Sequence, residues 1–209
     1  MSKVTAGFSM SLDGFVADPD DSVEHVFKWY SAGGTDAEVM VGDRAVKMSR
    51  EGAEYIEEAG RGPGVLVTAR RTFDLAHAWG GKHPMDVPMV VVTHTAPEEW
   101  VNREGSPFTF ITEGGVPKAI DVARGIAGDK DIVVGSPTVT QQCLQLGLLD
   151  AIHIDLVPVV LGRGIRLFDH LTKPTEFLVA EASGNPHVTH ITYQVIARTS
   201  DSSFNAKVL

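Results

Sequence analysis

The sequence contains a single cysteine, Cys143, among 209 residues. One thiol excludes an internal disulfide framework and a zinc site built from several cysteines. No apolar run approaches the roughly 18 residues that a membrane-spanning helix needs. The chain begins Met-Ser-Lys-Val-Thr-Ala-Gly-Phe, which lacks the charged, apolar and cleavage regions of a signal peptide. Together these absences predict a cytoplasmic protein with no membrane partner.

Positive charge is also scarce, because 18 Lys and Arg residues stand against 27 Asp and Glu residues, for a formal net charge of −9. A nucleic-acid backbone requires a basic face, so this composition excludes a nucleic-acid-binding protein. Hydrophobic residues make up 43% and charged residues 22%, which excludes wholesale disorder. At about 150 residues per domain, the length favours a single domain. We expect this domain at residues 1–199, followed by a polar tail at residues 200–209.

Short apolar runs rich in β-branched residues recur along the first two thirds of the chain. Such runs are typical of strands covered on both faces, as in a largely parallel sheet. They lie at residues 4–10, 65–68, 89–93, 108–111 and 132–134. Helical patterns separate several of them, at residues 44–59, 71–78, 116–127 and 138–146. This alternation predicts an α/β fold.

The final third has consecutive strand-like runs separated only by turn residues, at 151–157, 159–161, 177–182 and 189–197. Strands that follow one another without a crossover helix pair in antiparallel fashion. The Gly162-Arg163-Gly164 segment between two of these runs predicts a hairpin loop. The expected architecture is therefore an α/β domain with an antiparallel C-terminal end.

Three segments place polar side chains where a predicted strand ends. They are Ala69-Arg70-Arg71-Thr72, Thr93-His94-Thr95 and Gly135-Ser136-Pro137-Thr138. The carboxyl ends of parallel strands meet at one edge of a sheet, where ligands of open α/β folds bind. Adjacent arginines, hydroxyl groups and helix N-termini favour an anion, such as a phosphate of NADP. The alternative is that the arginines are solvated residues and that the glycine forms a tight turn without a ligand.

Other polar residues carry less specific signals. Asp13 belongs to an Asp-Gly pair, which is typical of a turn, and is also the candidate catalytic residue. His153 and Asp155 share one face of a strand, but without an evident third ligand we expect surface or interface positions and no metal site. We expect His190 to face water beside a hairpin turn. Cys143, on a helix beside leucines, is interpreted as a small buried hydrophobe.

Several sequence motifs resemble those of the dihydrofolate-reductase-like superfamily. They are Ser-Leu-Asp-Gly-Phe-Val-Ala at 11–17, Val-Thr-Ala-Arg-Arg-Thr-Phe at 67–73 and Trp-Gly-Gly at 79–81. The chain is more similar to the branch that contains the C-terminal reductase domain of the bifunctional riboflavin-biosynthesis deaminase/reductase. The most specific stretches are residues 146–150 and 157–168. No deaminase motif precedes them, so the resemblance implies a stand-alone reductase domain.

The resemblance implies a single-domain mixed twisted sheet with flanking helices and an NADPH site. Matched by position, the residues that would hold the phosphates are Arg70, Arg71 and Thr72. Thr93 and His94 would lie beside the adenosine 2′-phosphate or ribose. The residues around the pyrophosphate and nicotinamide ribose would be Gly135, Ser136, Pro137, Thr138, Val139 and Thr140. The residues near the nicotinamide would be Ala6, Leu12, Gly14, Phe15 and Val16.

The resemblance also implies an oxidoreductase that transfers a hydride from NADPH to a small heterocyclic substrate. The most specific expectation is a 5-amino-6-(5-phosphoribosylamino)uracil reductase-like enzyme of riboflavin biosynthesis, active as a homodimer joined through its C-terminal strands. The family usually has a Gly-Gly pair where this chain has Gly135-Ser136. This departure, together with the lack of a recognisable proton-donating carboxylate, leaves a nucleotide- or pterin-binding module without turnover as the alternative.

Overall fold

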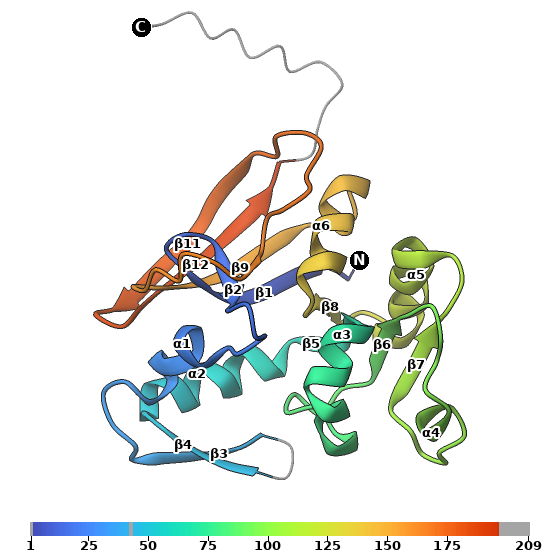
Figure 1. Cartoon of the computed structure of the whole chain (residues 1–209), viewed down its shortest axis with the longest axis horizontal. Coiled ribbons are helices and arrows are strands. Elements are labelled where there is room, and N and C mark those ends of the chain that lie inside the picture. Colours follow the sequence, from blue (N-terminus) through green and yellow to red (C-terminus); the bar gives the residue numbers. More distant parts are fainter. Residues whose placement is uncertain (1, 42–43, 197–209) are drawn as a thin grey trace, which may run out of the picture.

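The computed structural model describes residues 2–41 and 44–196, which form a central sheet flanked by helices (Figure 1). The eight strands are ordered β11-β12-β9-β1-β8-β5-β6-β7. Their bounds are β1 (Val4–Ser11), β5 (Pro63–Ala69), β6 (Met89–Val92), β7 (Phe108–Ile111), β8 (Asp131–Val134), β9 (Ala151–Val157), β11 (Phe177–Asn185) and β12 (Val188–Val195). The predicted tail at 200–209 lies outside the described residues.

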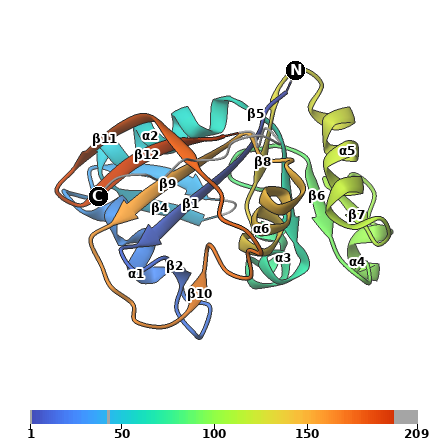
Figure 2. The ribbon, with the colours of Figure 1, turned by 90° about the horizontal axis from the view of Figure 1, so that it is seen from above.

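The sheet is parallel from β9 to β7 and antiparallel at its other end. β1 pairs in parallel with both β8 and β9, and β5 and β6 continue this direction. β12 pairs antiparallel with β9, and β11 pairs antiparallel with β12. This arrangement confirms the predicted α/β fold with an antiparallel C-terminal end. The β11–β12 hairpin and β7 therefore lie at opposite edges of the sheet, as Figure 2 shows from above.

Helices cover both faces of the sheet. On one face, α5 (Gly115–Ala127) and α6 (Pro137–Leu146) pack against the parallel strands and bury the largest hydrophobic cluster. On the other face lie α2 (Arg50–Arg61), α3 (Arg70–Leu75) and the 3₁₀ helix η2 (His77–Gly81). Burial of these apolar side chains supplies the main stabilising free energy of the fold.

Shorter elements connect these layers. They are β2 (Phe15–Ala17), α1 (Glu24–Phe27), η1 (Lys28–Ser31), β3 (Ala37–Val41), β4 (Arg44–Met48), α4 (Glu98–Val101) and β10 (Ile165–Arg166). β3 pairs antiparallel with β4, and β10 pairs antiparallel with β2, each pair forming a small sheet of its own.

The predicted helix at residues 44–59 is wrong over its first residues, which form strand β4. Helix α2 begins at Arg50 because the Ser49 hydroxyl accepts a hydrogen bond from the backbone N–H of Gly52 at 3.1 Å. A serine in this position satisfies a backbone donor that the first helical turn leaves free. The cap sets the helix start, and the residues before it are free to pair with β3.

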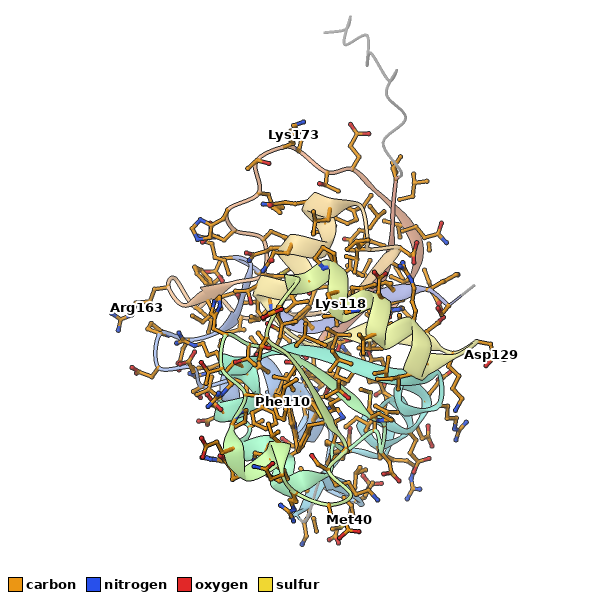
Figure 3. The ribbon with its side chains drawn as sticks, turned by 90° about the vertical axis from the view of Figure 1, so that its right-hand side faces the viewer. Met40, Phe110, Lys118, Asp129, Arg163 and Lys173 are labelled. Atoms are coloured by element: carbon orange, nitrogen blue, oxygen red, sulfur yellow. The ribbon has the colours of Figure 1, made fainter. Side chains whose placement is uncertain are left out.

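The predicted strand at residues 159–161 is also wrong. The backbone N–H groups of Leu161 and Gly162 donate to the Asp13 carboxylate at 3.1 and 2.7 Å, and the carbonyl of Val159 accepts from Leu12. These bonds use main-chain groups that a strand ladder would need. The Gly162–Gly164 turn is therefore not a hairpin of the main sheet, and Arg163 at its tip projects away from the body of the molecule (Figure 3).

Candidate functional site

A pocket of about 680 Å³ opens at the carboxyl edge of the sheet, beyond β5, β6 and β7. Its volume falls within the range of small-molecule sites. Parts of all three segments predicted from the sequence line it, and the lining residues among them are Ala69, Arg70, Arg71, Thr93, His94, Thr95 and Thr138. The predicted convergence at one edge therefore holds for these seven residues, and Val139, which was expected near the pyrophosphate, lines the pocket as well. Thr72, Gly135, Ser136, Pro137 and Thr140 stand beside the lining residues in sequence and do not line the pocket.

The two arginines at the start of α3 differ in their partners. Arg70 donates to Asp74 at 2.7 Å and, through Nη1, to the carbonyl oxygen of Thr95 at 2.7 Å. Arg71 forms a two-pronged ion pair with Asp21, with a shortest contact of 2.6 Å. The Arg70 side chain is 37% exposed and that of Arg71 is 67% exposed. The hydrogen bonds of Arg70 thus stabilise one wall of the pocket, whereas the guanidinium group of Arg71 is the more exposed of the two.

A hydroxyl-lined turn follows β6. The Thr93 hydroxyl donates to the carbonyl oxygen of Thr95 at 2.8 Å and accepts from the Thr95 backbone N–H at 3.2 Å. These two bonds close a tight turn that leaves His94 exposed at its tip. The turn brings the segment after β6 against Arg70, so the neighbouring strand ends share one wall of the pocket.

The start of α6 forms the opposite wall. Pro137 occupies the first helical turn, and the helix ends at Gly147 with φ 68°, which confirms both predicted helix signals. Ser136 is buried, and its hydroxyl lies 3.1 Å from the Thr138 hydroxyl. The buried Thr140 hydroxyl donates to the Ser136 carbonyl oxygen at 2.9 Å. The serine in place of the second family glycine therefore turns into the protein rather than into the pocket.

Several lining residues were not predicted from the sequence, which are Thr112, Gly114, Gly115 and Gln142. Gly114 and Gly115 begin α5 with φ of 77° and 58°. Positive φ favours glycine, and these glycines let the start of a 13-residue helix reach the pocket edge. The Gly-Gly pair two residues beyond the strand at 108–111 was the available signal. Figure 3 shows this side of the molecule, with Lys118 on α5.

The residues expected near the nicotinamide lie on β1, on the turn that follows it and on β2, outside the lining of the pocket. Ala6 is fully buried, Leu12 is exposed, and Gly14 has φ 86°. Phe15 is buried beneath the Arg166 guanidinium, which lies 4.3 Å from the ring centroid. Val16 is also buried. A role for these residues in cofactor binding remains a prediction.

Asp13 is held as a carboxylate within this turn. It accepts hydrogen bonds from the Ser11 hydroxyl at 2.7 Å and from two backbone N–H groups of the 159–162 segment. The Ser11 hydroxyl, followed by the backbone donors of Gly162 and Leu161, lowers the pKa of Asp13 to about 2. These contacts give Asp13 a role in joining two loops.

The expectations for Asp155 and His190 were wrong, because both side chains are largely buried on the face that carries α2. Asp155 Oδ1 accepts from the Tyr55 hydroxyl at 2.7 Å and lies 2.7 Å from His190 Nδ1. Desolvation, with a further contribution from the Asp155 charge, raises the pKa of Tyr55, so its hydroxyl stays protonated. His153 is exposed and Cys143 is buried, as expected.

Within residues 2–41 and 44–196, no three His, Cys, Asp or Glu side chains gather as a metal site requires. In the same ranges, no helix combines the length and the apolar character needed to cross a bilayer.

The family model described as the RibD C-terminal domain matches residues 2–189. The chain belongs to this family. No curated protein matches the sequence. Membership in the RibD C-terminal domain family agrees with the resemblance found in the sequence motifs, and the matched residues include the pocket and β11.

Solved structures share the fold of this RibD C-terminal domain. A putative riboflavin biosynthesis protein from Shewanella sp. PV-4 aligns with a TM-score of 0.70 and 19% identity, covering 93% of this chain and 99% of that one. The riboflavin biosynthesis reductase Rib7 of Saccharomyces cerevisiae aligns with a TM-score of 0.58 and 9% identity, covering 93% of this chain and 90% of that one. Dihydrofolate reductase from Enterococcus faecalis aligns with a TM-score of 0.54 and 10% identity, covering 92% of this chain and 96% of that one. The fold is therefore dihydrofolate-reductase-like.

Proposed function

We propose that this protein is an NADPH-dependent reductase that transfers a hydride to a small heterocyclic substrate. The observation that carries the proposal is the gathering of Arg70, Arg71 and several threonine hydroxyls around one pocket at the carboxyl edge of a parallel sheet. Membership in the RibD C-terminal domain family supports an oxidoreductase. The most specific form of the proposal is the reduction of a ribosylaminopyrimidine in riboflavin biosynthesis, in the cytoplasm.

The donor set of the pocket fits the phosphates of NADPH. Guanidinium groups and hydroxyls bind phosphate oxygens through charge-assisted hydrogen bonds, and the starts of α5 and α6 add backbone donors. Arg70 and Arg71 would hold the 2′-phosphate, and Thr138 would lie by the pyrophosphate. When bound, NADPH supplies a hydride from its nicotinamide ring. The protein's own contribution is to fix the two reactants in position and to exclude water.

Replacing Arg70 with alanine tests the assignment of the 2′-phosphate. We expect Arg70→Ala to weaken NADPH binding by about tenfold or more and NADH binding far less, because only NADPH carries this charged group. Fluorescence titration of both cofactors measures the two dissociation constants. Arg61→Ala is the matched control, because Arg61 is an exposed arginine on α2 that lies 3.8 Å from Glu57 and does not line the pocket. An equal loss for NADPH and NADH would contradict the assignment.

Turnover separates the reductase from the alternative, a nucleotide- or pterin-binding module. The measurement is NADPH oxidation in the presence of aminopyrimidines, pterins and quinones. Oxidation that depends on one of these compounds supports the reductase. Tight NADPH binding with no turnover on any compound would favour the binding module.

A further inference from the structure

The Ser136 side chain stands at the capping position of α6 but caps no backbone donor. A serine at this position normally accepts a hydrogen bond from the backbone N–H of the second or third helical residue. Here the Ser136 hydroxyl makes no such bond and lies 3.1 Å from the Thr138 hydroxyl. Within the part of the chain that the structure describes, the backbone N–H groups of Thr138 and Val139 have no protein acceptor. Because both residues line the pocket, these N–H groups remain available to a ligand.

The backbone around Ser136 is held on both sides. The Gly135 N–H donates to the carbonyl oxygen of Val67 on β5 at 2.9 Å. The Ser136 carbonyl oxygen accepts from the Thr140 N–H at 3.0 Å and from the Thr140 hydroxyl at 2.9 Å. The ring of Pro137 fixes the next φ angle, but proline has no N–H to donate. The start of α6 is therefore firmly positioned, and it lacks one of the donors that a helix presents at this end.

The burial of Ser136 decides the direction of the bond between the two hydroxyls. A hydroxyl has one hydrogen to donate, and burying that hydrogen is costly unless it meets an acceptor. Ser136 is 2% exposed, and Thr138 Oγ1 is the one partner that the described residues give its hydroxyl. Thr138 is exposed, so its own hydrogen can be donated outside the protein. Ser136 therefore donates to Thr138, and the hydrogen of the Thr138 hydroxyl is left for a ligand.

We infer that Ser136 is a positioning residue for the pyrophosphate of a dinucleotide, because its hydroxyl holds Thr138 as a hydrogen-bond donor to that group. The Thr138 hydroxyl supplies the donor that Pro137 cannot, beside the N–H groups of Thr138 and Val139. Three donors at a helix N-terminus suit an anion. The inference rests on the proposed function and deepens it, since it assigns the recognition of the pyrophosphate to the pair Ser136 and Thr138.

NADP⁺ and adenosine 2′-monophosphate test this assignment, because only NADP⁺ carries the pyrophosphate. We expect Thr138→Val to weaken NADP⁺ binding by about 10- to 100-fold, since it removes a hydrogen bond to a charged group. Thr138→Ser keeps the hydroxyl and should keep most of the affinity. Neither variant should change the binding of the monophosphate. Thr109→Val is the matched control, because Thr109 is an exposed threonine on β7 that does not line the pocket. Calorimetry measures each affinity.

Replacing Ser136 with alanine tests the positioning role itself. We expect Ser136→Ala to weaken NADP⁺ binding by about three- to tenfold and to leave binding of the monophosphate unchanged. In a Thr138→Val background, Ser136→Ala should cause no further loss, because Ser136 acts through Thr138. A residue that only supports the fold would weaken the binding of both ligands, and it would do so in either background.

The failure of this inference can be told apart from that of the proposed function. If the wild-type protein does not bind NADP⁺, the proposed cofactor site fails and the inference fails with it. If the wild-type protein and Thr138→Val bind NADP⁺ equally well, only the assignment of the pyrophosphate is overturned. Undiminished NADP⁺ binding by Ser136→Ala, or an equal loss in both backgrounds, overturns the positioning role. If Ser136→Ala does not fold, equal affinities of Thr138→Val and Thr138→Ser overturn the assignment, and a clear advantage of Thr138→Ser supports it.

Discussion

Arg71 pairs with the carboxylate of Asp21 and, under the proposed function, also binds a phosphate of the ligand. Its guanidinium lines the pocket, yet it is paired with Asp21 on the loop after β2, fifty positions earlier in the chain. Asp21 is the more buried partner, with an 18% exposed side chain against 67% for Arg71. Under the proposed function, a ligand phosphate competes with this carboxylate for the same donors.

Replacing Asp21 with asparagine is expected to strengthen binding of adenosine 2′,5′-bisphosphate by about two- to fivefold, the range that an exposed ion pair contributes. Asparagine also tolerates the positive φ of 64° at this position. Isothermal titration calorimetry measures the affinity, and Asp20→Asn is the control for the loss of one negative charge. Unchanged or weaker binding by Asp21→Asn would show that the ion pair does not compete with the ligand.

At the scale of elements, the segment from η2 to β6 depends on a neutral histidine. His83 Nδ1 accepts the backbone N–H of Met85 at 3.2 Å, and the ring packs edge-on against Trp79. Burial lowers the pKa of His83 to about 4. Protonation would remove the acceptor for Met85 and place a charge in this small apolar environment.

Because the unfolded chain has a His83 pKa near 6.5, it takes up a proton more readily than the folded chain. The contribution of neutral His83 to the free energy of unfolding is therefore complete above pH 6.5 and is lost as the pH falls toward 4. We expect the free energy of unfolding of the wild-type protein to fall by on the order of 2 kcal/mol between pH 7 and pH 5. The His83→Gln variant should not show this fall. Urea denaturation at both pH values measures it, with His25→Gln, on an exposed residue, as the control. Parallel pH dependence in all three proteins would disprove the role of His83.

At the scale of the whole molecule, the C-terminal hairpin leaves one edge of the sheet open. β11 is nine residues long and mostly exposed, and Leu178 and Val179 are 59% and 62% exposed. An edge strand of this length with apolar side chains is a template for pairing with another chain. We propose that it joins two copies of the protein in a homodimer.

Sedimentation velocity tests this dimer. We expect the mass obtained for the wild-type protein to be twice that of one chain. We expect Val179→Lys to weaken the association by about tenfold or more, because a charge is buried at the contact. Val160→Lys is the control, since Val160 is 66% exposed and lies in the loop after β9, outside β11. A monomeric wild-type protein, or a Val179→Lys variant that remains fully dimeric, would refute the proposed interface.

The amino-acid sequence by itself determined the features that depend on local chemistry. Apolar β-branched runs specified the strands, Pro137 and Gly147 marked the ends of α6, and residues at the ends of parallel strands pointed to one edge. Periodicity did not separate β4 from α2, because the signal was the single cap at Ser49.

Only the tertiary structure decided which distant groups meet. Asp13 with the backbone of Leu161 and Gly162, Arg71 with Asp21, and Asp155 with Tyr55 and His190 join residues that are 35 to 149 positions apart. Such contacts follow from strand order and register, which no local pattern encodes.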